Sequence, residues 1–265
     1  MKNKIIVSIV FLLSVIIYSC ESNDSPVVTS TPPLVNVPTN KILIELFTNT
    51  SCIPCVEANQ YLDAVHNLQG ITNNDTNVII LRIHTTLFAG DPFYLYNTTD
   101  NGARMSYYPN SAIVNPRTFL LGTFIGNFST APWTNKINEK LAAARPMAIS
   151  LTNTYNASNR TGDLSVRITQ DAGSSFTGLV YHIAVAENEI QYTAPNGETH
   201  FNNTLRDLVT PPAGQAFDIG SGQTNTYSQN YSIASGINQG LTDLIVFVQV
   251  LSTKEVLAVE KVKVQ

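Results

Sequence analysis

The stretch KILIELFTNTSCIPCVEANQYLDAVHNL, residues Lys41–Leu68, decides the fold of this chain. It opens with Lys41–Phe47, a run of strand length that is rich in apolar and β-branched residues. Within this run, Glu45 is the one interior polar residue. A short polar turn leads to Cys52 and Cys55, which enclose an Ile-Pro dipeptide, and apolar residues then recur at helical spacing. The pattern predicts a strand, a tight turn and a pair of thiols at the start of a helix.

Two thiols at the start of a helix have the geometry of a redox site. Unpaired backbone N–H groups and the positive end of the helix dipole stabilise a thiolate at Cys52. In such motifs the thiol pKa falls from about 8.5 to between about 3.5 and 7.5. Cys55, one helical turn further on, is placed to attack a mixed disulfide at Cys52. The alternatives are a structural disulfide and half of a zinc site, although the chain has no second cysteine pair to complete the latter.

The residues ILIELF…CIPC resemble the first core strand and the Cys-X-Pro-Cys helix of the thioredoxin superfamily. The resemblance implies an α/β thioredoxin-like domain over residues 41–145, which ends at Arg145-Pro146. It also implies a loop whose cis-proline faces the dithiol. We assign that role to Pro109, with Pro116 as the competitor, and expect Tyr108 and Pro109 to guide the backbone of a substrate.

Glu45 and His84 are further candidates for the chemistry. Glu45 lies roughly where thioredoxins keep a buried carboxylate that accepts the proton of the second thiol, and burial would raise its pKa toward neutrality. Alternatively, it points to a solvated face or pairs with Lys41 or Arg82. His84 ends the next apolar run and is expected mainly as a strand-end residue, with approach to Cys52 as the less favoured alternative.

The N-terminus reads as a targeting segment over Met1–Ser19. Lys2 and Lys4 precede the apolar run Ile5–Ile17, which is too short to span a bilayer comfortably. The following Cys20 completes a sequence that resembles a bacterial lipobox, so the resemblance implies lipidation at Cys20 and leaves two cysteines as a pair. The alternative is an ordinary secretory signal with a free cysteine.

Residues 20–40 are polar and contain several prolines, which is typical of a flexible tether, and the lipobox resemblance implies that this tether is lipidated. The whole chain has a formal net charge of −4 and only 13% charged residues. This composition argues against a nucleic-acid partner and favours an exported protein. We expect no cofactor and no resident metal.

From residue 146 to 265 the pattern changes to short strand-like runs between turn residues. This spacing predicts an all-β domain, an immunoglobulin-like sandwich. The six runs are Ala148–Thr152, Leu164–Thr169, Gly178–Val185, Thr226–Ile233, Leu244–Leu251 and Val256–Val264.

The segment between Glu187 and Asp218 is long for a sandwich loop, so we expect it to be functional or to form an extra strand. Arg206 and its neighbours are expected to pin it to the sandwich. Glu187, His200 and Asp207 are residue types that can bind a metal. Their spacing matches no metal-binding motif, so the sequence gives only weak support for a metal site.

Several segments together are similar to the 28-kDa outer-membrane lipoprotein family of Bacteroidetes-type bacteria. They are the lipobox, ELFTNTSCIPC, the Tyr-Pro entry to the third strand, AENEIQY…LRD and LIVFVQVLSTKEVLAVEKVKV. The resemblance implies a lipid-anchored protein of the cell envelope that lies at the outer membrane or is exposed on the surface.

Two functions of different classes follow. In the first, the protein is a thiol–disulfide oxidoreductase or disulfide-handling protein that acts on protein thiols and disulfides. In the second, the protein is a non-catalytic, adhesin-like surface protein that binds a surface ligand, and its Cys-Ile-Pro-Cys motif is a structural disulfide.

Overall fold

The apolar run of the deciding stretch forms the strand β1 (Ile42–Thr48), and the helix α1 (Ile53–Asp63) follows it. The computed structural model describes residues 40–65, 77–108 and 114–265. The predicted targeting segment, Cys20, most of the tether and Pro109 lie outside the described residues.

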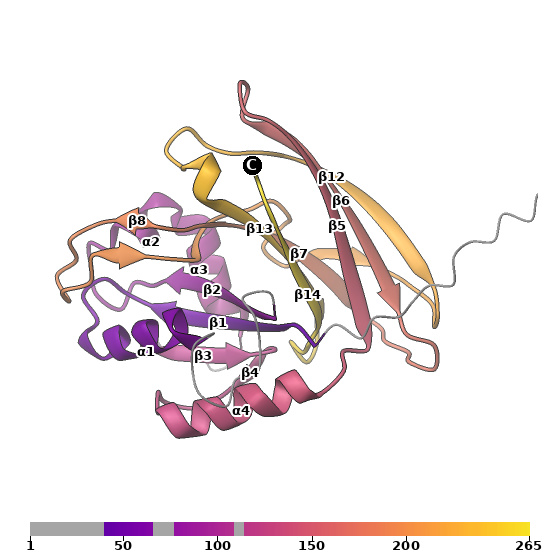
Figure 1. Cartoon of the computed structure of the whole chain (residues 1–265), viewed down its shortest axis with the longest axis horizontal. Helices are drawn as coiled ribbons and strands as arrows, with labels where there is room; N and C mark the ends of the chain where they lie inside the picture. The colour runs from indigo at the N-terminus through magenta and orange to yellow at the C-terminus, as the bar shows by residue number, and fades with distance from the viewer. Residues whose placement is uncertain (1–39, 66–76, 109–113) are drawn as a thin grey trace, which may run out of the picture. The chain divides into compact units, whose positions relative to one another are not determined.

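The first half of the described chain builds a four-stranded arrangement with the order β2-β1-β3-β4. β2 runs parallel to β1, whereas β3 is antiparallel to β1 and β4 is antiparallel to β3. This alternation of strands and helices is the topology that the thioredoxin resemblance implies (Figure 1). The further elements are β2 (Val78–His84), α2 (Pro92–Tyr96), α3 (Thr98–Tyr107), β3 (Arg117–Leu120), β4 (Thr123–Phe124) and α4 (Thr130–Ala142).

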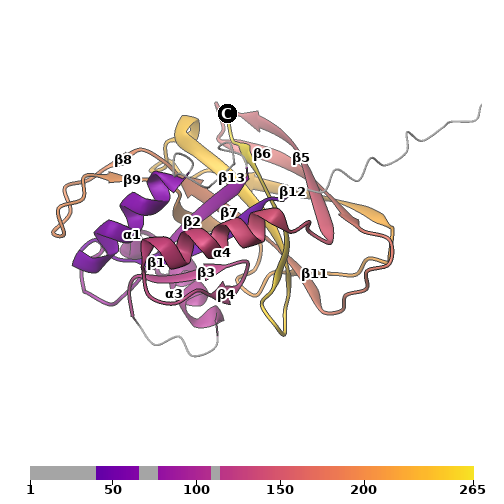
Figure 2. The ribbon, with the colours of Figure 1, turned by 60° about the horizontal axis from the view of Figure 1, so that its bottom comes forward.

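Helices cover both faces of these strands. α1 and α4 lie together on one face (Figure 2), where the rings of Tyr61 and Trp133 are 6.0 Å apart between centroids. Asn59 of α1 contacts Thr48 of β1 on this face, with 3.3 Å between Nδ2 and Oγ1. Because side chains alternate along a strand, Glu45 must point to the opposite face. There it meets α3.

The six strand-like runs predicted after residue 146 all lie within or overlap long strands. Three of these strands form a separate sheet with the order β12-β6-β5, and a hydrophobic core lies between this sheet and the strands β7, β13 and β14. The strands are β5 (Met147–Asn156), β6 (Thr161–Gln170), β7 (Leu179–Glu187), β12 (Thr224–Ser232), β13 (Thr242–Val250) and β14 (Val256–Lys263).

The long segment between Glu187 and Asp218 contains extra strands, as one of the two alternatives predicted. A hairpin comes first, and a strand that joins the large sheet follows it. The elements are β8 (Ile190–Gln191), β9 (His200–Phe201), β10 (Thr204–Leu208) and β11 (Gln215–Phe217), and a short 3-10 helix, η2 (Gln239–Leu241), precedes β13.

β10 connects the two halves of the chain within one sheet. It pairs in parallel with β2 through Thr204 and Arg82, and antiparallel with β7. The result is a nine-stranded mixed sheet with the order β14-β13-β7-β10-β2-β1-β3-β4, to which β11 is added at β7. Strands from both sides of Arg145, the predicted domain boundary, thus share one sheet, and the division into two domains stays a prediction.

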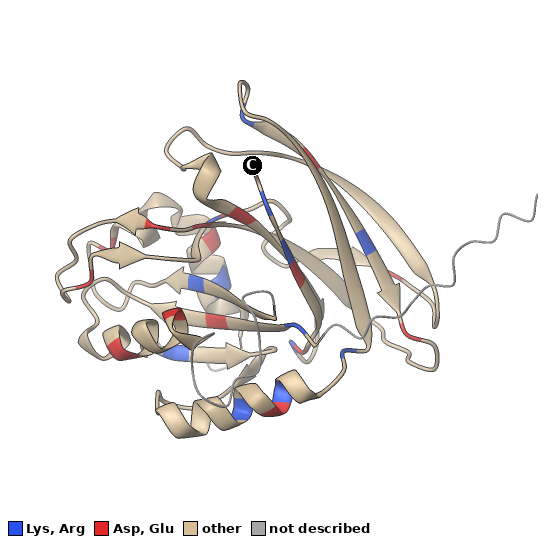
Figure 3. Ribbon diagram, viewed as in Figure 1, with Lys and Arg blue, Asp and Glu red and all other residues tan. Residues whose placement is uncertain are grey.

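The described chain is mostly β-structure with few helices. In this part of the chain no helix combines the length and the apolar character needed to cross a membrane. Positive and negative residues are interspersed along the ribbon (Figure 3).

Candidate functional site

Cys52 and Cys55 form a disulfide at the start of α1, with 5.3 Å between their Cα atoms. Cys52 is the residue that precedes the helix, and Pro54 occupies its first turn. The backbone N–H of Cys55 donates to the carbonyl of Cys52 at 3.2 Å. The two sulfur atoms are thus bonded to each other at the position that the motif predicted.

The turn before the disulfide is held by the side chain of Asn49. Its amide Nδ2 donates to the carbonyls of Thr85 at 2.8 Å and Phe88 at 3.0 Å. Its Oδ1 accepts the backbone N–H of Ser51 at 2.8 Å, and its carbonyl accepts that of Cys52 at 3.0 Å. This one asparagine therefore ties the turn to the segment that follows β2.

His84 is linked to the turn through Asp91. The His84 Nδ1 and the Asp91 Oδ2 are 2.8 Å apart, and the same oxygen accepts the backbone N–H of Thr50 at 2.8 Å. Burial raises the pKa of Asp91, but the hydrogen bond and charge of His84 and the N–H groups of Tyr94 and Thr50 outweigh it, so the pKa lies below its usual value. His84 is thus a strand-end residue whose partner is a carboxylate. Asp91 is not among the candidates found from the sequence.

Both cysteines are buried. The exposed fraction is 1% for Cys52 and 0% for Cys55, whereas 65% of the neighbouring Ile53 is exposed. A protein substrate that reacts at Cys52 must therefore first displace the groups that cover it.

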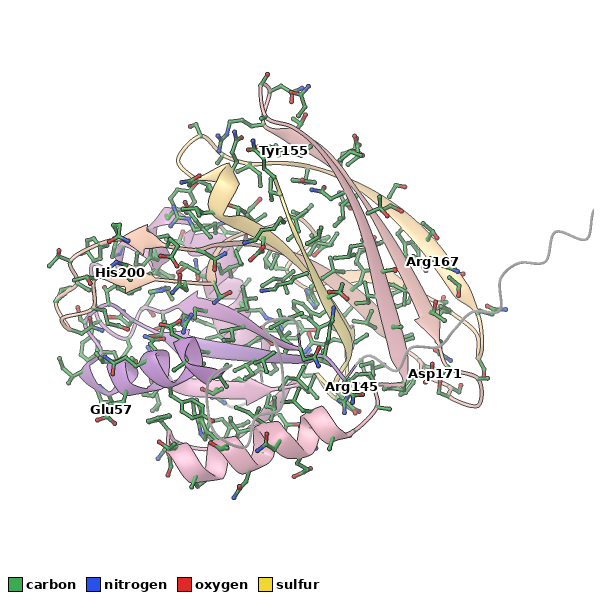
Figure 4. The ribbon with its side chains drawn as sticks, viewed as in Figure 1. Glu57, Arg145, Tyr155, Arg167, Asp171 and His200 are labelled. Carbon is green, nitrogen blue, oxygen red and sulfur yellow. A yellow bond between two sulfur atoms is a disulfide. The ribbon has the colours of Figure 1, made fainter. Side chains whose placement is uncertain are left out.

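A groove of about 320 Å³ lies beside the disulfide helix. Pro54 and Glu57 of α1 form one wall, and Asn115 and Pro116 belong to the opposite loop. The peptide bond between Asn115 and Pro116 is cis. The remaining lining residues are Val114, Asn127 and Phe128. Glu57 extends outward from α1 (Figure 4).

The loop that carries Pro116 is fixed to the end of β2. Asn115 donates from Nδ2 to the Oγ1 of Thr85 at 2.6 Å, and the backbone N–H of Thr85 donates to Thr48 at 3.0 Å. Pro116, the competitor in the sequence assignment, therefore combines a cis peptide bond with a position opposite Pro54. Pro109 lies outside the described residues, and its assignment stays a prediction.

Tyr108 does not face the groove, contrary to its expected role in guiding a substrate. Only 2% of this residue is exposed, and its hydroxyl donates to the carboxylate of Glu45. Burial, together with the nearby Glu45 carboxylate, raises the pKa of Tyr108 well above its usual value. In this structure Tyr108 therefore contacts Glu45, and it gives no support to the role in guiding a substrate.

Glu45 is buried, but its partner is neither of the cations considered from the sequence. Its carboxylate accepts two hydrogen bonds from the guanidinium of Arg104, at 2.6 and 2.8 Å. Lys41 instead pairs with Glu260, and Arg82 pairs with Asp63. Since Glu45 points to the α3 face and Cys55 belongs to α1 on the other face, the geometry gives no support to proton relay from Cys55 to Glu45.

The charged residues of the long segment have separate partners. Arg206 pairs with Glu187 at 3.1 Å, and its guanidinium lies 3.6 Å from the ring centroid of Tyr96. It thus pins the segment, as predicted, to both β7 and α2. His200 is exposed on β9 and is labelled in Figure 4, whereas Asp207 contacts Asp100 of α3.

Comparison with known proteins bears on the fold. No protein-family model and no curated protein matches the chain. The structure is similar to HBP35 of Porphyromonas gingivalis, with a TM-score of 0.72 and 15% sequence identity over 84% of this chain and 74% of that chain. A domain of the outer membrane lipoprotein Omp28 from Porphyromonas gingivalis also matches, with a TM-score of 0.35 and 18% identity over 46% of this chain and 89% of that domain. At this identity the likeness to HBP35 shows a shared fold, which is thioredoxin-like.

Proposed function

We propose that the protein is a thiol–disulfide oxidoreductase of the cell envelope whose reacting groups are Cys52 and Cys55. The observation that carries the proposal is the placement of this disulfide at the start of α1, beside a groove whose opposite wall contains cis-Pro116. A purely structural bridge needs neither the helix start nor the groove.

In the reduced protein, the Cys52 thiolate attacks one sulfur of a substrate disulfide. A bond forms between Cys52 and that sulfur, and the other substrate sulfur leaves as a thiolate. The Cys55 thiolate then attacks the Cys52 sulfur, which restores the intramolecular disulfide and releases the substrate as a dithiol. A second protein dithiol must reduce the pair before the next cycle, and the same steps in reverse oxidise a substrate.

The groove fits an extended peptide segment of the substrate. Its walls combine apolar surface from Pro54, Pro116 and Phe128 with the amides of Asn115 and Asn127. Such a mixture suits a backbone flanked by uncharged side chains. Glu57 is the charged residue among those that line the groove, so it favours a substrate with a basic side chain near the reacting cysteine.

The second function is the non-catalytic one, and the burial of both cysteines favours it. With exposed fractions of 1% and 0%, the disulfide has the enclosure of a structural bridge. In that case the chain is an adhesin-like protein that binds a surface ligand, and the disulfide stabilises the start of α1.

The reduction potential of the Cys52–Cys55 pair separates the two functions. The experiment uses the full chain with Cys20→Ser, so that only this pair titrates in glutathione and dithiothreitol buffers. A potential between about −120 and −270 mV supports exchange, whereas a value below about −300 mV supports a structural bridge and contradicts the proposal.

Trapping identifies the attacking thiol. With Cys55→Ser, we expect Cys52 to retain a substrate as a mixed disulfide that reducing agent releases. The matched variant Cys52→Ser should trap none and should lose insulin reduction. Activity that survives Cys52→Ser would show that the nucleophile is assigned wrongly.

We extend the proposal to location: Cys20 carries a lipid, and the protein belongs with the outer-membrane lipoproteins of Bacteroidetes-type bacteria. The lipobox-like sequence supports this placement. Incorporation of a labelled fatty acid that is abolished by Cys20→Ser is the expected result. Unchanged labelling in that variant would contradict the lipid anchor.

A further inference from the structure

The hairpin β8–β9 brings a distant part of the chain to the disulfide. Asn196, at its tip, donates its backbone N–H to the carbonyl of Thr50 at 3.0 Å. Its side-chain Nδ2 donates to the carbonyl of Cys52 at 3.3 Å. One residue therefore holds the chain at two points, in the turn before the pair and at Cys52 itself, although it lies 144 positions from Cys52 in sequence.

The Asn196 side chain is itself held in place. Its Nδ2 also donates to Oε2 of Glu198 at 2.6 Å, and its Oδ1 accepts the backbone N–H of Glu198 at 3.1 Å. The other carboxylate oxygen, Oε1, accepts from Asn59 of α1 at 2.9 Å. The hairpin tip is thus bound both to the turn before Cys52 and to the second turn of the helix that follows it.

A small apolar cluster fixes the hairpin both at its base and near its tip. Ala194 and Phe201 pack against Phe93 of α2, and all three are at least 95% buried. The rings of Phe93 and Phe201 are 4.8 Å apart between centroids. Because the base is packed and the tip is hydrogen-bonded, the hairpin is a rigid support rather than a loop that happens to lie nearby.

We infer that Asn196 is a positioning residue that sets the redox equilibrium of the Cys52–Cys55 pair. This inference deepens the proposed function and rests on it, since the equilibrium has a biochemical use only if the disulfide exchanges. In the oxidised protein the covalent bond itself holds the two sulfurs together. In the reduced protein the turn keeps its conformation through hydrogen bonds, and those from Asn196 are among them.

The direction of the effect follows from effective concentration. Without the Asn196 amide, the reduced turn has more conformations, so the two thiols meet less often and the disulfide forms less favourably. The reduced state is then favoured relative to wild type, and the pair becomes more oxidising. A purely structural role for Asn196 would lower the stability of both redox forms equally and leave this equilibrium unchanged.

The test compares Asn196→Ala with the parent chain, both carrying Cys20→Ser, in dithiothreitol redox buffers. We expect the equilibrium constant for disulfide formation to fall about fivefold to tenfold, and tenfold corresponds to about 30 mV. The matched control is Asn225→Ala on β12, which also removes a side-chain hydrogen bond to a backbone carbonyl, that of Asp218 at 3.0 Å. The control should leave the equilibrium constant unchanged.

An equilibrium constant for Asn196→Ala within twofold of the parent value would overturn the inference. If Asn196→Ala gives no cooperative thermal transition, Glu198→Gln decides in its place. This variant weakens the hydrogen bond that holds the Asn196 amide, so we expect a shift in the same direction. No shift in Glu198→Gln would then overturn the inference.

Failure of the proposed function gives a different pattern. A parent potential below about −300 mV, with no trapped substrate, rejects exchange as the function. The difference between Asn196→Ala and the parent is still measurable in dithiothreitol, and it decides the positioning role by itself. The two hypotheses can therefore fail separately.

Discussion

Glu45 and Arg104 form a buried ion pair, and 1% of each side chain is exposed to solvent. The Arg104 guanidinium also lies 4.1 Å from the ring centroid of Tyr107 and donates to Gln249 of β13 at 3.2 Å. Burial lowers the pKa of Arg104, but the charge and hydrogen bonding of Glu45 together with Tyr108 and Tyr107 outweigh it, so the net shift is upward. The pair thus joins β1, α3 and β13.

Removal of one partner of this pair should be costly. Glu45→Gln leaves the Arg104 charge buried without its counter-ion, so we expect a loss of about 3–5 kcal/mol in the free energy of unfolding, measured in urea. The double variant Glu45→Leu with Arg104→Met removes both charges and should lose far less than the two single changes together.

The matched control for this cycle is Glu139→Gln, since Glu139 pairs with Lys140 while 68% of its side chain is exposed. A change within about 0.5 kcal/mol is expected there. If Glu45→Gln were as mild as the control, Glu45 would not be a structural carboxylate, and its candidacy for proton transfer would return.

The local part of the structure could be predicted, and the non-local part could not. The strand–turn–helix around Cys52 and the six late strands follow from hydrophobic periodicity, which acts over a few residues. The partner of Glu45 is 59 positions away, and the residue that holds the Cys52 carbonyl is 144 away. Periodicity carries no information on such pairings.

The proline assignment shows the same division. Sequence reasoning found the loop and both X–Pro bonds in it, Tyr108-Pro109 and Asn115-Pro116. The isomer of such a bond depends on tertiary contacts, among them the hydrogen bond from Asn115 to Thr85. The structure places a cis bond at Pro116, whereas the assignment of Pro109 stays a prediction.

At the scale of elements, α3 and β10 meet through two carboxyl groups. Burial and the neighbouring Asp100 raise the pKa of Asp207 from 3.8 to about 6. The Oδ2 of Asp100 also accepts the backbone N–H of Leu208 at 2.9 Å, which holds the two groups close together. A proton on Asp207 therefore stabilises this contact, because it removes the repulsion between two neighbouring carboxylates.

This contact makes stability depend on pH. The folded state binds the proton of Asp207 more tightly than the unfolded state, so the stability should fall as pH rises from about 4 to about 6. Asp207→Asn should remove that loss and stabilise the protein at pH 7 by about 1–2 kcal/mol, because solvent screening reduces the full value of the shift.

The measurement is a series of thermal melts between pH 4 and pH 8. The melting temperatures of Asp207→Asn and wild type should converge toward the acidic end and separate above pH 6. The exposed Asp163 provides the control, since Asp163→Asn should track wild type throughout. A constant offset for Asp207→Asn across the range would contradict the shared-proton explanation.

At the scale of the whole described chain, the thioredoxin-like half depends on strands that come after it in sequence. β10 covers the edge of β2, where the N–H of Arg82 donates to Asn203 at 2.8 Å. Arg104 reaches Gln249 and lies 5.2 Å from the ring centroid of Phe247, both on β13. We therefore expect the Cys-Ile-Pro-Cys motif to be part of a larger cooperative unit.

A fragment of residues 41–145 should consequently fail to fold by itself. It would expose the edge of β2 and leave the Arg104 network incomplete, so we expect no cooperative transition by circular dichroism. The control is a fragment of residues 41–265, which should melt cooperatively close to the full chain. A cooperative melt of the shorter fragment would restore the division after Arg145.

The cover over the cysteines has a consequence for the order of events in a growing chain. The two cysteines are three positions apart, so they can join as soon as they emerge. The hairpin tip that holds their turn emerges 144 positions after Cys52. An oxidant that acts on the growing chain thus reaches thiols that are still accessible. A reagent that acts after folding must first displace the residues that enclose the two sulfur atoms.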